Sequence, residues 1–280
     1  MNPIETLSFI TWNVDPRIFP GFELFLWYGL LWAVGTLLGY QVMFFIYKKE
    51  GLLPSELDKL ATYLILGAIL GARFGHILFY DPIYYWNNPI EILPIQIQPH
   101  FQFKGLEGLA SYGGVLGTLI ALYLYHKKYK GNFLWILDRL AISAALLGGF
   151  IRLGNLMNSE IIGIPTFVQW AFVFTRIDHT PRHPTQLYEA IFYFFISIFL
   201  FHLWKLGRVK NYSGFIFGLG ASLIFTLRFL IEFLKENQVS FEESLLLNMD
   251  QTLSIPMILI GIFILARSII QPFKIREENV

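Results

Sequence analysis

Residues 133–156 read FLWILDRLAISAALLGGFIRLGNL, and this stretch decides the class of fold. A helix needs about 20 mostly apolar residues to cross a bilayer, and this stretch supplies them with few charged side chains. Similar stretches recur along the chain. They predict seven spans at about residues 23–47, 57–80, 108–126, 133–156, 186–204, 213–234 and 252–270. The sequence therefore predicts an all-α integral membrane protein with seven transmembrane helices.

The composition of the whole chain agrees with this prediction. Of 280 residues, 55% are hydrophobic and 15% are charged, against about 25% charged in soluble domains. Lys and Arg number 21 and Asp and Glu 20, for a formal charge of +1, so no basic field is available to bind nucleic acid. The absence of Cys excludes a cysteine nucleophile within the chain. We expect a single membrane domain over residues 1–280 and no nucleic-acid partner.

The distribution of Lys and Arg between the loops predicts the orientation, because cytoplasmic loops carry an excess of both. One side of the predicted spans has four, namely Arg17, Lys104, Arg176 and Arg182. The other side has twelve: Lys48, Lys49, Lys59, Lys127, Lys128, Lys130, Lys205, Arg208, Lys210, Arg267, Lys274 and Arg276. We therefore expect the N-terminus outside and the C-terminus in the cytoplasm. We expect the long outside connections, 81–107, 157–185 and 236–251, to be ordered loops. We also expect no cleaved signal peptide among the first residues.

Polar and ionisable side chains gather at one depth of these spans, in their outer halves. Each ionisable group costs about 2.5–3.5 kcal/mol at the centre of a membrane helix, so each requires a reason. Arg presents a planar fork of donors that matches phosphate. The layer therefore predicts recognition of an anion at the depth of lipid headgroups. Its members are Tyr28, Arg73, His76, Tyr112, Arg152, Asn155, Asn158, Glu160, His183, Gln186, Tyr188, Glu189, Arg228 and Glu232.

Some of these residues also fit a purely structural role. Arg228 and Glu232 are four residues apart and are typical of an ion pair that fixes helix packing. His76 is typical of a core or interface histidine, and Tyr28 and Tyr188 fit an aromatic belt. Arg139 beside Asp138 reads as a paired structural charge and is left out of the site.

Metal and nucleotide chemistry find no support in the sequence. His179 and His183 are four residues apart, but Pro181 interrupts any helix that would put them on one face. No phosphate-binding glycine loop of the nucleotide-binding kinds is present. We expect neither a metal nor another cofactor.

Two long motifs resemble a known family. Residues 152–163, RLGNLMNSEIIG, are similar to the R-x-G-N-x-x-N-x-E-x-x-G signature of the bacterial prolipoprotein diacylglyceryl transferases. Residues 182–189, RHPTQLYE, are similar to the R-H-P-[ST]-Q-L-Y-E motif of the same family. Shorter matches at residues 27–29, 71–73 and 228–233 extend the resemblance over nearly the whole chain.

The resemblance implies a lipid transferase of the bacterial inner membrane. Family members move the diacylglyceryl group of phosphatidylglycerol to the thiol of the lipobox cysteine in the signal peptide of a prolipoprotein. This is the first step of lipoprotein maturation, and it releases glycerol phosphate. By this resemblance Arg152 binds the phosphate with help from Asn155, and Arg228 is a second clamp that Glu232 orients. Further substrate contacts are implied for Tyr28, Arg73, Asn158, Gly163, Gln186, Tyr188 and Glu189.

One position departs from the family pattern. Many members have a His before the paired glycines of the third span, where this chain has Tyr112. A tyrosine with a pKa of about 10 is a poor base near neutral pH. Either this candidate catalytic position supplies no base, or Glu160, His183 or Glu232 serves.

Two other classes of protein remain as alternatives. A transporter or lipid-binding protein for an anionic solute or headgroup would also use buried Arg, with polar groups along the whole membrane depth. A structural membrane protein would need only paired charges. The concentration of polar residues in the outer half, together with the two motifs, favours the transferase.

Overall fold

The computed structural model describes residues 9–21, 25–93, 95–96, 102–103, 110–207, 209, 211–236 and 247–271. The long helices are α1 (Trp27–Lys49), α2 (Pro54–Phe79), α4 (Ser111–Tyr129), α5 (Phe133–Asn158), α6 (Thr185–Lys205), α7 (Phe215–Ile231) and α8 (Met249–Ile270). Each corresponds to one of the predicted spans, and the ends differ by a few residues. Residues 23 and 24, which begin the first predicted span, lie outside the described residues.

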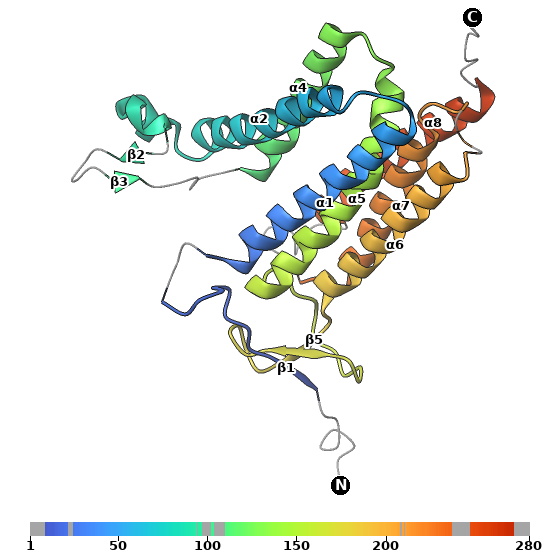
Figure 1. Ribbon diagram of the computed structural model, residues 1–280. Coiled ribbons are helices and arrows are strands. Elements are labelled where there is room, and N and C mark those ends of the chain that lie inside the picture. Colours follow the sequence, from blue (N-terminus) through green and yellow to red (C-terminus); the bar gives the residue numbers. More distant parts are fainter. Residues whose placement is uncertain are drawn as a thin grey trace, which may run out of the picture. The chain divides into compact units, whose positions relative to one another are not determined.

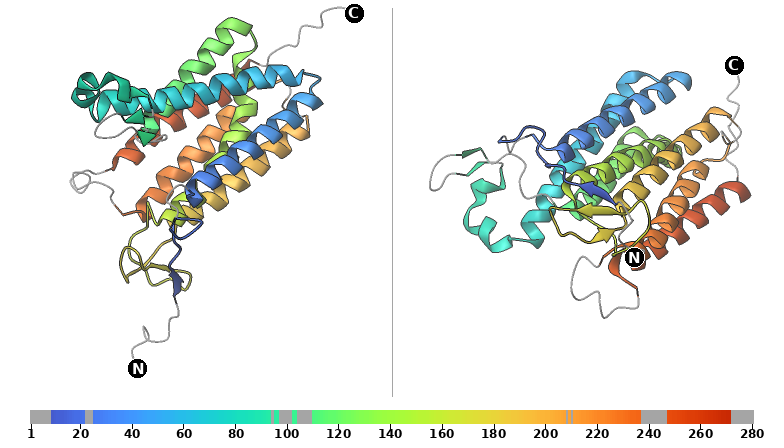
Figure 2. Two further views of the ribbon diagram at one scale, coloured as in Figure 1. Left: turned by 60° about the vertical axis from the view of Figure 1, so that its left-hand side comes forward. Right: turned by 90° about the horizontal axis from the view of Figure 1, so that it is seen from below.

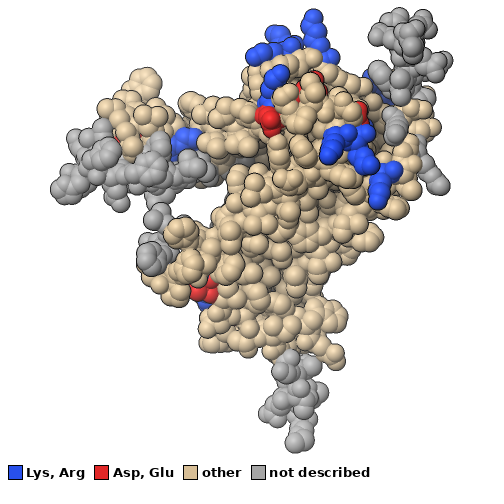
Figure 3. Space-filling model, in the orientation of Figure 1, with Lys and Arg blue, Asp and Glu red and all other residues tan. Residues whose placement is uncertain are grey.

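Six of these helices are long and apolar enough to cross a membrane: α1, α2, α5, α6, α7 with its extension to Leu234, and α8. Helix α4 has 19 residues and is not among the six. Large apolar side chains are exposed on the outside of these helices. On α6, for example, Ile191, Phe195 and Ile198 are all more than half exposed. Figure 3 shows few charged side chains along the flank of the long helices. Such a surface suits hydrocarbon rather than water.

The chain divides into two compact units, and the first comprises residues 1–43 and 134–280. It holds most of α1 and α5, and all of α6, α7 and α8 (Figure 1). Glycines permit the closest helix contacts. A Cβ built on Gly218 of α7 would lie 2.6 Å from the backbone nitrogen of Leu265 on α8. The Ser197 hydroxyl on α6 donates to the carbonyl of Ile142 on α5 at 2.8 Å, so α5 to α8 form a packed bundle.

Asp138 and Arg139 have the structural role that the sequence favours. The Asp138 carboxylate, near the start of α5, accepts the backbone N–H groups of Gly214 and Phe217, each at 2.8 Å. These groups belong to the first turn of α7, where backbone donors have no partner within the helix. Arg139 lies 3.7 Å from Asp138 and stacks on Trp135. The pair therefore fixes α7 against α5.

A small β-sheet is added at one end of the bundle, and the all-α expectation was incomplete in this respect. Strands β1 (Ile10–Trp12), β4 (Phe172–Phe174) and β5 (Pro181–Arg182) form it in the order β1-β4-β5, with β1 parallel and β5 antiparallel to β4. The Trp12 indole donates to the Leu156 carbonyl at 3.0 Å. The sheet thus lies where α5 ends and α6 begins (Figures 1 and 2). The connection 157–185 is ordered, as expected.

The second unit comprises residues 44–133. Its helices α2 and α4 contact each other through backbone, because three glycines on α2 face two on α4. A Cβ built on Gly71 would lie 2.3 Å from the Gly113 carbonyl oxygen, and one on Gly117 would lie 2.1 Å from the Gly67 carbonyl oxygen. This is the small-residue packing that membrane helices use.

Short elements follow α2 in this unit: α3 (Pro82–Asn87), the 3₁₀ turn η2 (Pro89–Ile92) and the two-stranded pair β2 (Ile95–Gln96) and β3 (Gln102–Phe103). Residues 94, 97–101 and 104–107 of the predicted loop at 81–107 lie outside the described residues, as do residues 237–246 of the loop at 236–251. Of the cations used to predict orientation, Lys104, Arg208, Lys210, Lys274 and Arg276 also lie outside them.

Candidate active site

The first motif builds a sharply turned end to α5. The N–H of Glu160 bonds to the Asn155 carbonyl at 2.9 Å and that of Ser159 bonds to the Leu156 carbonyl at 3.1 Å, which is the Schellman pattern. Ser159 adopts a φ of 56°, where glycine is usual, and Ile161 follows at 57°. Non-glycine residues in this region cost energy and are common at functional sites. The turn folds Glu160 back towards the last turn of α5.

Four buried charges from three elements form the centre of the site. Arg152 Nε lies 2.9 Å from Glu189 Oε2, and Lys235 Nζ lies 3.3 Å from Glu189 Oε1. Lys235 Nζ also lies 2.7 Å from Glu232 Oε2. Positive and negative groups therefore alternate from α5 through α6 to η3 (Glu232–Leu234), the 3₁₀ turn that follows α7. All four side chains are buried, and Glu189 is completely so.

Each charge in this network depends on its partners for stability. A buried charge that loses its partner costs about 3–5 kcal/mol, because the remaining group stays desolvated. The two cations and two anions here balance, so the low dielectric strengthens every contact. Asn248, before α8, donates to Glu232 Oε1 at 3.1 Å. Arg228 Nη2 lies 2.7 Å from Asp250 Oδ2, which also ties α7 to α8.

An amide and carboxylate arm extends from Arg152. Its Nη1 donates to Asn155 Oδ1 at 3.2 Å, and Asn155 Nδ2 donates to Glu160 Oε2 at 3.1 Å. Asn158 Nδ2 donates to Glu160 Oε1 at 3.0 Å. Gln186, at the start of α6, donates to the Glu160 carbonyl. The two motifs of the sequence thus meet through side-chain hydrogen bonds.

Arg152 retains donors for a ligand. A guanidinium has five N–H groups. One on Nη1 donates to Asn155, and Nε forms an ion pair with Glu189. The others have no hydrogen-bond partner among the residues that the structure describes. Tyr28, near the start of α1, packs over Gly154, since a Cβ there would lie 2.7 Å from Tyr28 Cδ2. The phenol ring therefore packs against the turn of α5 that also carries Arg152 and Asn155.

The segment before α6 is held mainly by Arg182. Its Nη2 lies 2.7 Å from Asp178 Oδ2, and its Nη1 lies 3.1 Å from Glu236 Oε2. These contacts raise the pKa of Arg182 and lower that of Asp178. A Cβ on Gly163 would lie 2.5 Å from the His183 carbonyl oxygen, so only glycine fits there. Gly163, predicted as a substrate contact, is explained here by backbone packing.

His183 belongs to a chain of three rings. The Trp170 indole donates to the Tyr188 hydroxyl at 2.7 Å, and that hydroxyl lies 3.1 Å from His183 Nδ1. The indole is only a donor, but the phenol oxygen can also accept a second hydrogen bond. The Tyr188 contact at Nδ1 therefore fits either neutral tautomer of His183. Burial lowers the pKa of His183, which favours the neutral ring.

The structure unites most of the predicted site. Eight predicted site residues of the first unit are joined by the contacts described above: Tyr28, Arg152, Asn155, Asn158, Glu160, Gln186, Glu189 and Glu232. The predicted pairing of Arg228 with Glu232 was wrong. Helix α7 ends at Ile231, and the 3₁₀ turn directs Glu232 to Lys235 while Arg228 contacts Asp250.

Three predicted residues belong to the second unit: Arg73, Tyr112 and His76, whose ring stacks on Tyr80. Arg73 donates from Nε to the Ile92 carbonyl at 3.0 Å and from Nη2 to the Glu91 carbonyl at 2.6 Å. It also stacks on Tyr85, so its visible role is to hold the η2 turn. Tyr112 is 72% exposed.

Lys235, Asn248 and Asp250 were missed by the sequence analysis. Lys235 is not among the predicted site residues, although its position three residues after Glu232 is a signal for a pair. Asn248 and Gln251 form a capping box at the start of α8. That spacing, N-x-x-Q before an apolar run, was visible in the sequence.

The chemistry of the cluster is that of an anion site with a neighbouring carboxylate. Arg152 offers charged donors, and Glu160 offers an exposed carboxylate on the same arm. Within the described ranges, no group of three or more His, Asp or Glu side chains is arranged to hold a metal ion.

Comparison with known proteins identifies the family. Residues 18–267 match the family model for prolipoprotein diacylglyceryl transferase. A phosphatidylglycerol–prolipoprotein diacylglyceryl transferase of Bacteroides fragilis is 49% identical over 258 residues, or 91% of this chain and 93% of the relative. Proteins of the same name from Tolumonas auensis and Chloroherpeton thalassium are 48% and 41% identical, over 92% and 96% of this chain and 96% and 97% of their own lengths. The chain therefore belongs to the prolipoprotein diacylglyceryl transferase family.

Proposed function

We propose that this chain transfers the diacylglyceryl group of phosphatidylglycerol to the lipobox cysteine of a prolipoprotein. The thiolate sulfur attacks the C3 carbon of the diacylglyceryl group, and the bond from C3 to the phosphate oxygen breaks. The phosphate leaves with the electron pair as glycerol phosphate, and the thiol proton passes to a base. The lipid thus supplies the phosphate and the precursor supplies the thiol that this chain lacks.

The observation that carries this proposal is the Arg152 guanidinium with donors left over in a buried, balanced charge network. Negative charge grows on the departing phosphate as the C–O bond breaks. Preorganised donors in a low-dielectric site stabilise such charge without reorganising. Glu189 holds the guanidinium from Nε, so the opposite edge faces the ligand. Arg228, held by Asp250, is the proposed second cation.

Glu160 is the best candidate for the base. Glu232 is buried and already bonded to Lys235 and Asn248. Nδ1 of His183 already contacts the Tyr188 hydroxyl, and burial lowers the pKa of this ring. The Glu160 carboxylate is exposed, and its described side-chain partners are two amides. It accepts the proton as the carbon–sulfur bond forms, while Tyr112 supplies none.

The membrane arrangement is part of the proposal. All seven long helices cross the bacterial inner membrane, with the N-terminus outside and the C-terminus in the cytoplasm. Helix α4 is then the seventh span, paired with α2 through glycine. The chain acts as one membrane domain, and its site faces the outer leaflet, where secreted precursors emerge.

The test uses purified protein and phosphatidylglycerol labelled in the diacylglyceryl group. The acceptor is a lipobox peptide with Cys, and the control peptide has Ser at that position. We expect label on the Cys peptide alone and release of one glycerol phosphate per peptide. Glu160→Gln should slow transfer more than Glu160→Asp. Binding of phosphatidylglycerol without any transfer would overturn the proposed reaction.

A further inference from the structure

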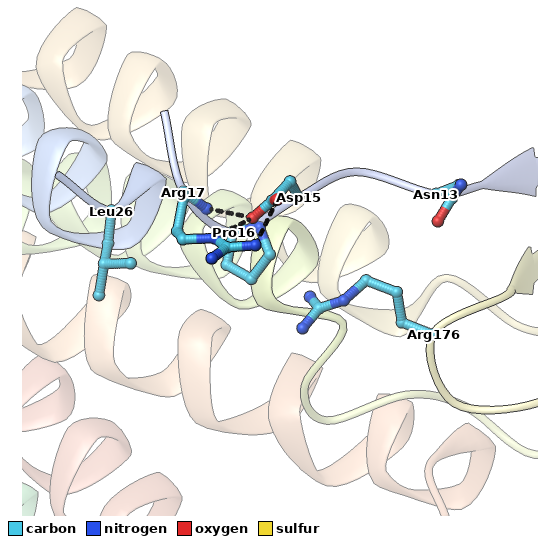
Figure 4. Close-up of a pocket in the computed structure, with 6 residues that line it drawn as sticks. All are labelled: Asn13, Asp15, Pro16, Arg17, Leu26 and Arg176. Atoms are coloured by element: carbon cyan, nitrogen blue, oxygen red, sulfur yellow. Dashed lines mark hydrogen bonds and ion pairs between the residues drawn. The ribbon is translucent and has the colours of Figure 1, made fainter. Parts of the chain in front are cut away.

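A second polar pocket lies in the first unit, beside the sheet. It is about 620 Å³ in volume, within the range of small-molecule sites, and its described lining is Asn13, Asp15, Pro16, Arg17, Leu26 and Arg176. None of these residues belongs to the Arg152 cluster. Figure 4 shows the two walls: the segment before α1, and Arg176 reaching in from the β4–β5 connection.

Both walls are fixed by hydrogen bonds. The Ile18 N–H bonds to the Phe25 carbonyl at 2.8 Å and the Trp27 N–H bonds to the Pro16 carbonyl at 2.9 Å, which folds one wall into a tight hairpin. On the other wall, the Thr175 N–H bonds to the Trp12 carbonyl at 3.2 Å. Arg176 therefore projects from an anchored position, and the pocket is preformed.

The electrostatics of this pocket favour an anion. Arg17 Nε and Nη2 each lie 3.0 Å from an oxygen of Asp15, and this bidentate contact lowers the pKa of Asp15 to about 2. The pair is thus neutral over the physiological range. Arg176 is exposed, and its charge also helps to lower the pKa of Asp15. The three charged side chains of the lining, Asp15, Arg17 and Arg176, therefore sum to one positive charge.

Exposed apolar side chains lie close in sequence to the lining residues on both walls. Phe19 and Phe25 are 56% and 55% exposed, and Ile177, next to Arg176, is 54% exposed. A cation beside large exposed apolar groups is typical of a surface in the interfacial region of a bilayer. A soluble anion would not require those groups, whereas a phospholipid presents a phosphate above hydrocarbon.

We propose that this pocket binds the phosphate of an anionic phospholipid headgroup, at a site separate from the Arg152 cluster. Arg176 supplies the charge and the planar fork, and Asn13 adds a polar side chain on the facing wall. Phe19, Phe25 and Ile177 contact the upper acyl chain. The binding step is independent of the transfer reaction, since it needs neither the precursor peptide nor Arg152.

The test exploits the absence of Cys from the chain. A fluorophore is attached to Thr11→Cys, an exposed position near the pocket but outside its lining. Protein in phosphatidylcholine bicelles is titrated with phosphatidylglycerol that carries a quenching spin label on its headgroup, without peptide. We expect saturable quenching that unlabelled phosphatidylglycerol displaces and added phosphatidylcholine does not.

Variants assign the binding to Arg176. Arg176→Ala should raise the half-saturating lipid fraction about five- to tenfold, and Arg176→Lys should raise it less. Lys205→Ala, an exposed cation at the far end of α6, is the matched control and should change nothing. Equal half-saturation in Arg176→Ala and the unchanged protein overturns the proposal. Complete displacement by inorganic phosphate alone also overturns it, because the site would then serve a soluble anion.

Discussion

Replacement of Glu189 by Gln should destabilise the protein through two cations at once. The side chain keeps its shape but loses its charge, so Arg152 and Lys235 stay buried with Glu232 as their one carboxylate in the network. Loss of one partner from a buried pair costs about 3–5 kcal/mol. Lys235→Met should cost a similar amount, because it leaves two anions with one cation.

The double variant Glu189→Gln with Lys235→Met separates this account from simple loss of contacts. It restores charge balance, so its cost should fall short of the sum of the single costs by about 1–3 kcal/mol, as expected for directly coupled groups. The assay is reversible unfolding in mixed micelles, with the free energy taken from each titration. Costs that add to within about 0.5 kcal/mol would refute the reasoning, because they would mean that the charges do not interact.

Three other predictions follow from particular contacts. Gly71→Ala places a Cβ against the Gly113 carbonyl oxygen and should cost about 1–3 kcal/mol of unfolding free energy, whereas Gly29→Ala, with open space around it, should cost nothing in the same titration. Tyr188→Phe removes the hydroxyl that contacts His183 Nδ1, so the ¹⁵N shift of Nδ1 should change; an unchanged shift would contradict the contact. Arg182 lowers the pKa of Asp178 below its usual 3.8, so the stability from this pair is present above pH 3.8 and is lost as pH falls through the lower folded value. The fall in melting temperature over that range should be smaller in Asp178→Asn, and equal falls would argue against the pair.

The long helices were predictable because length and apolar composition alone specify them. The helices of the structure begin and end within a few residues of the predicted spans. The β-sheet was not predictable, since its strands have two or three residues and show no alternation that a pattern could detect. It forms because Trp12 and the residues after Gly163 meet at the end of the bundle.

The site was predictable as a set of residues but not as a set of contacts. Motif spacing placed Arg152, Asn155 and Glu160 together, and all three are linked by hydrogen bonds. Spacing failed for Arg228 and Glu232, because each side chain takes another partner. The Glu232 N–H still bonds to the Arg228 carbonyl, but Arg228 contacts Asp250 and Glu232 contacts Lys235. Partners such as Asp250 come from a different helix, and a single sequence carries no signal for that pairing.

The central claim is that Arg152 recognises the phosphate of the lipid. Its most direct test is the dissociation constant of phosphatidylglycerol for Arg152→Gln, without peptide, beside Arg139→Gln at the other end of α5. Hydrogen bonds to a charged group contribute about 1.5–3 kcal/mol, so the account predicts binding about 10- to 150-fold weaker for Arg152→Gln and unchanged for Arg139→Gln. Equal affinity in Arg152→Gln and the unchanged protein would contradict it.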